Sequence, residues 1–358
     1  MVLKPLQTVD LWRDNMNRRD FLNRAVSATG AGIFGGMILR TQDANAASSQ
    51  GKIITVSGEL SPRKIGTMLP HEHVMSTFGA DLSRYPEYDT KALFESVVPY
   101  LKKVRELGCD VLADCTAIYF GRDPLILRRL SELSGLHILT NTGYYGAADD
   151  RYIPDHAYSE SASELAARWI REWRDGIDGT GIRPGFIKIG VDGSGLSDID
   201  AKLIDAAAET HLATGLVIAA HTSGNSEGAL EQIQRMKQIG AHPSAWIWVH
   251  AQNGDEDAIL QAAEAGAWIE FDGVSQDSIE EHLGFVRMMK SNGYMGQTLL
   301  SHDGNSFRAS GREPKPYDAL FTDFIPVLKK DGFSQREIQQ LTVSNPAAAF
   351  GVRIRKMA

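Results

Sequence analysis

After residue 60, short runs of apolar residues alternate with longer stretches in which apolar and polar residues recur at helical spacing. The short runs are rich in Ile, Val, Leu or aromatic residues and stop at polar or glycine-containing segments, which is typical of buried strands. They predict eight strands, at Lys64–Leu69, Cys109–Cys115, Leu136–Thr142, Phe186–Val191, Leu216–His221, Ala245–His250, Ala267–Asp272 and Gln297–Asp303.

The longer stretches predict helices, and several of them end at glycine, as helices commonly do. These are Lys91–Gly108, Asp198–Gly215, Glu227–Gly240, Glu256–Gly266, Ile279–Gly293, Tyr317–Lys330 and Ser334–Phe350. Eight strands in alternation with helices are typical of a parallel sheet, and the number eight favours a closed (β/α)8 TIM barrel. The alternative is an open doubly wound sheet, which normally has a Gly-rich dinucleotide-binding turn after its first strand; no such turn is present here.

The first 46 residues have a different pattern from the rest of the chain. Arg18 and Arg19 lie in the segment NRRDFL, the fifteen mostly apolar residues 25–39 follow, and residues 44–46 (ANA) have the small-x-small pattern of a cleavage site. This order predicts a twin-arginine signal that recruits the export machinery, is cleaved near Ala46 and directs the protein to the periplasm. A membrane anchor is the alternative, but fifteen residues are fewer than the ~20 that span a bilayer. Met16 directly precedes the arginine pair, so residues 1–15 are compatible with an overlong gene start.

The remaining residues, 47–358, are expected to form a single domain, because α/β barrels commonly exceed ~250 residues. The whole chain of 358 residues is 43% hydrophobic and 23% charged, as is usual for a soluble globular protein. Its formal net charge is −8 and it has no long basic run, so no nucleic-acid partner is expected. A homodimer is compatible with this composition.

Polar residues that bind metals occur where the predicted strands end. In α/β barrels the active site lies at these carboxyl-terminal ends. The chain has ten histidines, and four of them fall at the ends of only three strands. The resulting set of candidate metal ligands is His71, His73, Lys188, His221, His250 and Asp303.

Each candidate alone has an ordinary structural explanation. A His-x-His pair points both rings to one face of a strand, but loop histidines are also common. Lys188 lies inside the apolar segment FIKI, where it would need a salt bridge, a route to water or neutralisation. His221 and His250 could be buried structural histidines, and Asp303 could cap a helix. Their shared location at the strand ends favours the metal site over these separate explanations.

The chain resembles the phosphotriesterase family of the amidohydrolase superfamily. The matching motifs are GTMLPHEH (66–73), FIKI (186–189), His221-Thr222, His250 and SHD (301–303), and the resemblance spans about residues 60–350. It implies that Lys188 is carboxylated by carbon dioxide and bridges two divalent metal ions, with zinc the expected metal. It places the buried ion with His71, His73 and Asp303, and the more exposed ion with His221 and His250.

The resemblance also implies the chemistry. Two cations lower the pKa of a bridging water, so that hydroxide is available at neutral pH. Asp303 would orient this hydroxide and accept its proton. His302 is the next candidate for the base.

Other positions depart from the better-known branches of the family. The proton relay of its phosphotriesterases runs from the strand 8 Asp through a His to an Asp, and the matching positions here are Gly273 and Asn253. Gly273 also replaces the arginine that many lactonases of the family have. Tyr145 matches the lactonase tyrosine near the metals and is expected to assist catalysis, although a wall without chemistry is the alternative.

The residues expected to contact the substrate are Tyr144, Tyr145, Gly273 and Arg308. Tyr152 lies near the same loop and could add to an apolar wall. Arg308, Arg312 and Lys315 follow Asp303 and could meet an anionic group, or they could simply face solvent.

The predicted function is a metal-dependent hydrolase of lactones or other carboxylic esters. The alternative within enzymes is a phosphotriester or phosphodiester hydrolase. A different class is a periplasmic metal-binding barrel without catalysis, but loss of catalysis usually removes a ligand or an acid, and all six are present.

Overall fold

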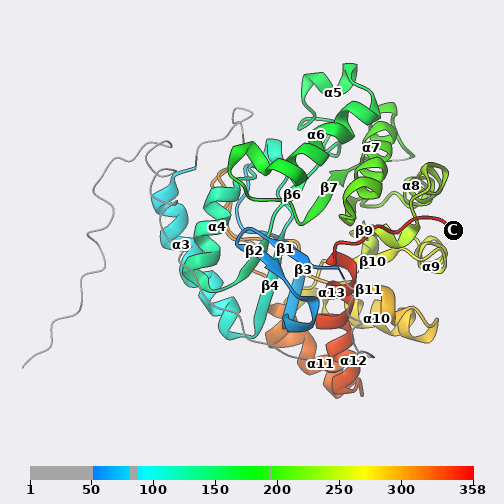
Figure 1. Cartoon of the computed structure of the whole chain (residues 1–358). Helices are drawn as coiled ribbons and strands as arrows, with labels where there is room; N and C mark the ends of the chain where they lie inside the picture. The colour runs from blue at the N-terminus through cyan, green and yellow to red at the C-terminus, as the bar shows by residue number, and fades with distance from the viewer. Residues whose placement is uncertain (1–50, 81–87, 194) are drawn as a thin grey trace, which may run out of the picture. The chain divides into compact units, whose positions relative to one another are not determined.

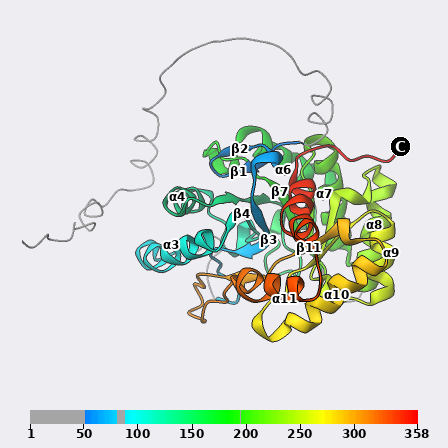
Figure 2. The same cartoon turned by 90° about the horizontal axis from the view of Figure 1, so that it is seen from below.

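The fold consists of parallel strands joined by helices that lie around them (Figure 1, Figure 2). The computed structural model describes residues 51–80, 88–193 and 195–358. The predicted export signal lies outside these residues. Within them, no helix combines the length and the apolar character that crossing a membrane requires.

Apart from an antiparallel hairpin at its start, the described domain has two parallel sheets whose strand order follows the chain. One sheet has the order β12-β3-β4-β5 and the other β11-β10-β9-β8-β7-β6. Each predicted strand overlaps an observed strand or pair of strands. The bounds are β3 Thr67–His73, β4 Cys109–Asp114, β5 His137–Leu139, β6 Asn141–Thr142, β7 Phe186–Gly190, β8 Ile218–His221, β9 Trp246–Val249, β10 Trp268–Phe271, β11 Thr298–Leu300 and β12 Gly304–Asn305.

The two sheets continue into one another along the chain at both ends. Only Thr140 separates β5 from β6, and its carbonyl oxygen accepts a hydrogen bond of 2.7 Å from the Gly185 amide. At the other end, three residues separate β11, which pairs with β10, from β12, which pairs with β3. Within that gap the Asp303 amide donates to the His71 carbonyl oxygen at 3.2 Å.

Helices connect successive strands, and most show one buried face. In α3, Leu93, Val97, Leu101 and Val104 are buried and recur every three or four residues, which is the spacing of one helical face. The connecting helices are α3 Thr90–Glu106, α4 Pro124–Ser134, α5 Asp155–Ser159, α6 Ala162–Asp175, α7 Asp198–Thr214, α8 Ser226–Ile239, α9 Glu256–Glu264 and α10 Ile279–Ser291. Of these, α4, α5 and α6 add to the helices named from the sequence.

Three predicted elements differ from the structure near the ends of the domain. The first strand of the sheet begins at Thr67 rather than Lys64, because Pro62 opens a 3-10 turn over Pro62–Lys64. An antiparallel hairpin, β1 Ile53–Thr55 and β2 Gly58–Leu60, precedes it. The predicted helices 317–330 and 334–350 are each interrupted by a π-helical turn. The first comprises η8 Leu320–Phe324 and α11 Ile325–Lys330. The second comprises α12 Gln335–Gln339, η9 Gln340–Ser344 and α13 Asn345–Phe350.

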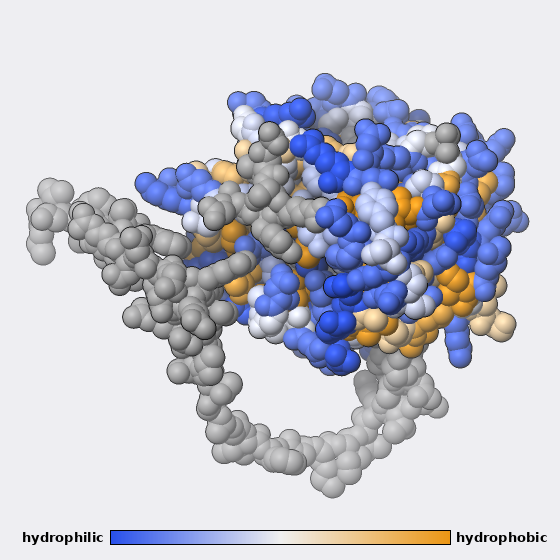
Figure 3. All heavy atoms as spheres, turned by 90° about the horizontal axis from the view of Figure 1, so that it is seen from above, coloured by the Kyte–Doolittle hydropathy of each residue, from blue (hydrophilic) through white to orange (hydrophobic). Residues whose placement is uncertain are grey.

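Alternate strand residues enter two different apolar clusters. Met68, Val111, Leu139, Phe186 and Ala219 share one cluster, whereas their neighbours Leu69, Leu112, Ile138, Ile187 and Ile218 pack into the other, which includes helical residues. Burial on both faces explains why these strands appear as continuous apolar runs. The surface in Figure 3 is mostly hydrophilic, with smaller hydrophobic patches.

Candidate metal centre

The predicted ligands line one pocket of about 330 Å³. All six candidate residues are among its lining residues, which are His71, His73, Ser76, Phe78, Phe120, Tyr145, Lys188, His221, His250, Asp303, Asn305, Arg308, Arg312 and Lys315. Residues from positions 71 to 315 therefore meet at one place, as expected where parallel strands end together.

The pairing of neighbouring strands brings the candidate ligands at their ends together. Gly190 pairs with His221, and His221 pairs with Val249, so Lys188 and His221 lie on neighbouring strands and His250 directly follows the next one. His250 has a φ of 65° and Asp303 a φ of 49°, which are left-handed conformations that residues other than glycine rarely adopt. Such backbone strain is often found at functional sites, because the surrounding structure must hold it.

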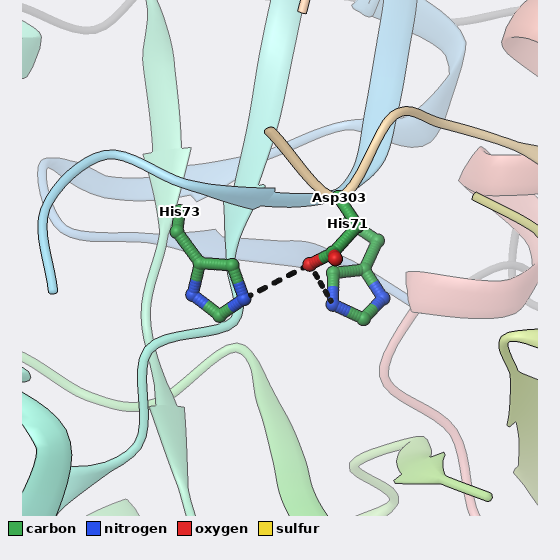
Figure 4. A group of neighbouring side chains, drawn as sticks. All are labelled: His71, His73 and Asp303. Atoms are coloured by element: carbon green, nitrogen blue, oxygen red, sulfur yellow. Dashed lines mark ion pairs between the residues drawn. The ribbon is translucent and has the colours of Figure 1, made fainter. Parts of the chain in front are cut away.

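His71, His73 and Asp303 form one group with metal-ligand spacing (Figure 4). Asp303 Oδ1 lies 3.6 Å from His71 Nε2 and 3.2 Å from His73 Nε2. Their candidate ligand atoms all lie within 4.8 Å of one another. Two imidazole nitrogens and a carboxylate oxygen are suitable zinc ligands, so these three residues could hold one ion.

His221 and His250 lie beside this group. Their ring centroids are 4.5 Å apart, and the centroid of His250 is 5.1 Å from that of His71. These imidazoles could hold a second ion next to the first. The described residues contain another cluster with metal-ligand spacing, formed by His71, His250 and Asp272.

Asp272 is better explained as a support for the two imidazoles than as a ligand. Its carboxylate lies 2.6 Å from His250 Nδ1 and 3.0 Å from His71 Nδ1, and it accepts from the His250 amide. These are hydrogen-bond distances, which place the ring protons on Nδ1 and leave Nε2 for a metal. Glu270 lies 3.1 Å from the same nitrogen of His71. The strand pattern alone did not identify either carboxylate.

The charges of this cluster suit metal binding. Burial, followed by the charge of Lys188, lowers the pKa of His71 to about 3, so its imidazole is neutral. Burial and the charge of His250 also hold the pKa of His221 well below its usual value. Burial would raise the pKa of Asp303, but the hydrogen bond from His73 and the charge of His250 outweigh it and lower the pKa. Neutral histidines and an anionic carboxylate are the forms that bind metals.

Lys188 is the least expected side chain in this environment. It lies on the same strand face as buried Phe186, it is itself 1% exposed, and its Nζ has no hydrogen-bond partner. An ammonium group buried without an acceptor is costly. Neither alternative explanation, a salt bridge or a route to water, is met among the described residues.

His302 does not reach the pocket, although it precedes Asp303. It is completely buried; its Nδ1 donates to Glu72 Oε1 at 2.6 Å, and its Nε2 accepts from the Leu320 amide at 2.9 Å. Glu72 also accepts from Ser301 Oγ and the Gly304 amide. With both ring nitrogens engaged, His302 is not available as the alternative base, and that expectation was wrong.

A profile of the Phosphotriesterase family matches residues 51–350. The chain belongs to the phosphotriesterase family. This family is metal-dependent and its members are hydrolases, which agrees with the cluster of histidines and Asp303.

The names of relatives in the phosphotriesterase family describe several different activities. The phosphotriesterase homology protein of Escherichia coli K12 is 29% identical over 295 residues, which cover 80% of this chain and 98% of that protein. An aryldialkylphosphatase of Saccharolobus solfataricus is 27% identical over 307 residues (81% and 96%). An N-acetyltaurine hydrolase of Xenopus tropicalis is 24% identical over 345 residues (84% and 98%). A mutant phosphotriesterase-like lactonase of Deinococcus radiodurans has a similar structure, with a TM-score of 0.74, 27% identity and coverage of 84% and 100%.

The structure separates the predicted substrate contacts of this phosphotriesterase family member into two groups. Tyr145 and Arg308 line the pocket, and the Tyr145 ring lies 5.2 Å from that of His221. Tyr144 does not line it, because its hydroxyl hydrogen-bonds to His156 Nε2 at 2.9 Å and its ring packs against Trp169. Tyr152, also outside the lining, stacks on Phe78.

Gly273 also lies outside the pocket lining. A Cβ atom at this position would lie 3.2 Å from Gln252 Nε2 and 3.2 Å from Cε1 of His282. Position 273 therefore faces Gln252 and the His282 ring of α10. His282 was not anticipated, because no motif in the sequence connects this helical histidine with Gly273, although it lies only nine positions later.

Proposed function

We propose that this chain is a binuclear metal-dependent hydrolase of lactones or carboxylic esters, built on a closed (β/α)8 barrel of the amidohydrolase superfamily. The observation that supports it most is the convergence of four histidines, Asp303 and an unpartnered buried lysine in one pocket. Closure of the barrel is supported by the chain continuity of β5 with β6 and by the pairing of β12 with β3.

The residues present fit two metal ions. His71, His73 and Asp303, whose candidate ligand atoms lie close together, would hold one ion, and His221 and His250 would hold the other. Carboxylated Lys188 would bridge them, because carboxylation turns a buried cation without a partner into an anion. We expect zinc, since imidazole-rich sites suit it. When bound, the metals supply Lewis acidity that activates water and polarises the substrate oxygen.

The side chains of the protein perform the remaining tasks. Asp303, whose pKa is lowered, is an anionic acceptor that can take the proton of the attacking water. Burial and the charge of Asp303 raise the pKa of Tyr145 well above its usual value. Tyr145 therefore keeps its proton and acts as a hydrogen-bond donor to the substrate or leaving oxygen. His71 and His250 are held in one orientation by Asp272.

The absence of a relay favours a carboxylic ester over a phosphotriester. Asn253 donates from Nδ2 to Ser223 Oγ at 2.9 Å and has no titratable group, and Gly273 has no side chain. Neither can take a proton onward from Asp303, which the phosphotriesterase relay requires. The names of two relatives, aryldialkylphosphatase and N-acetyltaurine hydrolase, point to phosphotriesters and to N-acetyl amides as the competing substrate classes.

Kinetics of the metal-loaded protein test this proposal. We expect kcat/KM for a γ- or δ-lactone or an aryl acetate to exceed that for paraoxon and for an N-acetyl amide, because the relay is absent. All four compounds are measured at one pH with one metal preparation. If paraoxon is the best substrate, the protein is a phosphotriesterase and the missing relay does not limit it.

We also propose export to the periplasm by the twin-arginine route, on the pattern of residues 17–46. The mature protein is expected to begin near Ala47, before the hairpin that starts at Ile53. N-terminal sequencing of periplasmic protein measures this directly. Exported material that still begins at Met1 or Met16 would contradict the proposed cleavage.

A further inference from the structure

Three basic side chains line the same pocket as the candidate ligands. Arg308, Arg312 and Lys315 all follow β12, and Asp303 is the one carboxylate among the described lining residues. The sequence left open whether these cations face solvent or a ligand. The structure places all three in the pocket.

Backbone pairing fixes the segment that carries these cations. The Ser76 amide donates to the Phe307 carbonyl oxygen at 2.9 Å, and the Ala309 amide donates to the Ser76 carbonyl oxygen at 2.9 Å, so Arg308 is flanked by two hydrogen bonds. Asn305 and Lys315 exchange both of their backbone hydrogen bonds, at 2.7 and 2.9 Å. Arg308 and Lys315 are thus attached to a rigid part of the fold, which gives a binding group a defined position.

The two arginines have no ionic partner among the described residues. Arg308 is half-buried, and its Nε is buried without a hydrogen bond. Arg312 is exposed, and its guanidinium lies beside Gly79, where a Cβ atom would be 3.7 Å from its Cζ. Lys315 Nζ is 3.6 Å from Asp303 Oδ2 and so is partly compensated. The partly buried guanidinium of Arg308 would gain most from a carboxylate or another planar anion, and the exposed Arg312 adds positive charge beside it.

An aromatic wall completes the pocket. The ring centroids of Phe120 and Tyr145 are 5.0 Å apart, those of Phe78 and Phe120 are 6.0 Å apart, and Phe78 is 42% exposed. The pocket therefore offers both aromatic side chains for a ring or acyl chain and positive side chains for an anion.

We propose that the natural substrate is an acidic lactone or ester, whose anionic group is bound by Arg308 and Arg312 while its apolar part contacts Phe78 and Phe120. This inference rests on the proposed hydrolase function and specifies its substrate class. Lys315 contributes positive charge but also neighbours the catalytic carboxylate, so it is less suited to a test.

A matched pair of γ-lactones tests the substrate class. The anionic 5-oxotetrahydrofuran-2-carboxylate and its neutral carboxamide have the same ring and the same scissile bond. For the metal-loaded wild type, we expect a higher kcat/KM for the carboxylate. In Arg308→Gln/Arg312→Gln, the ratio of the two kcat/KM values should fall about 10- to 100-fold, the usual effect of losing charged hydrogen bonds. Arg308→Lys should retain part of this preference, because it keeps the charge.

Arg336→Gln is the matched control, because Arg336 is exposed on α12 and outside the pocket lining. The control should leave the ratio unchanged. An unchanged ratio in the double variant would overturn the inference. Thermal unfolding and metal content of each variant establish that it is folded and loaded.

A binding experiment separates this inference from the hydrolase proposal. Tetrahydrofuran-2-carboxylate, which has no ester bond, is titrated calorimetrically into metal-loaded wild type and into the double variant. Tenfold or greater weakening in the double variant supports the arginine site, even if no lactone is hydrolysed, in which case only the hydrolase proposal fails. Equal affinity in both proteins means that the metals or another site bind the anion, and the inference is wrong.

Discussion

Lys188→Ala is expected to lose most of its bound metal and to reduce turnover by ~10³ or more, because several kcal/mol of metal-derived stabilisation disappear. The side chain is buried, and its Nζ has no hydrogen-bond partner. If that nitrogen carries a carboxylate in the active protein, alanine removes the bridging anion and leaves an empty space behind it. Elemental analysis gives the metal content, and lactone kinetics give the rate.

Two companion measurements identify the carboxylated lysine itself. Labelling with ¹³C-bicarbonate should give a carbamate signal in wild type that Lys188→Ala lacks. Acetate or propionate should partly restore metal and activity to Lys188→Ala by occupying the vacated space. Lys188→Met is the matched control, since its unbranched side chain fills that space and leaves no room for the added acid. A fully metallated, active Lys188→Ala enzyme would refute the bridging role.

Asp303→Asn is expected to lower kcat by ~10²–10⁴, which is the usual contribution of a general base. The substitution preserves the shape of the side chain, but the amide cannot accept the proton of water. Metal binding should weaken less than in Lys188→Ala, because His71 and His73 remain and Asp272 still holds His71. The measurement is kcat together with metal content, so that loss of the base is distinguished from loss of the ion.

Activity of Asp303→Asn within a few-fold of wild type would show that another group accepts the proton. His302 could not be that group without a rearrangement, since both of its ring nitrogens are hydrogen-bonded inside the fold. A variant that is inactive but also metal-free would leave the ligand role as the explanation and would contradict the expected separation of the two functions.

The sequence by itself was sufficient for the parallel α/β fold and for the six candidate metal ligands that meet in the pocket. Buried strands between two apolar layers give continuous apolar runs, as in residues 216–220, so the positions of the strands can be recognised from the local sequence. Since parallel strands end at the same edge, a ligand at the end of each run must approach the others. For this reason the amino-acid sequence alone is enough to group His71, His221 and His250.

The direction of side chains within β3 required the tertiary structure. In a regular strand, side chains alternate between the two faces, so Glu72 rather than His71 would share the face of Met68. The pairing of β3 with β4 is irregular between Leu69 and Glu72, and this breaks the alternation. His71 consequently lines the pocket, while Glu72 turns to His302 and Gly304. A bulge depends on the partner strand and has no signature in the motif itself.

The tertiary structure was also needed to identify the residues that hold the candidate ligands in place and the residues that line the pocket around them. Asp272 contacts His71 across about two hundred positions, and Arg308 joins the site because Ser76 pairs with the backbone on either side of it. Tyr144, next to Tyr145, instead hydrogen-bonds to His156. Periodicity places a residue on an element and a face, because it arises from local backbone geometry. Which distant side chain it meets depends on strand registers and loop paths, and these are set by packing across the whole domain.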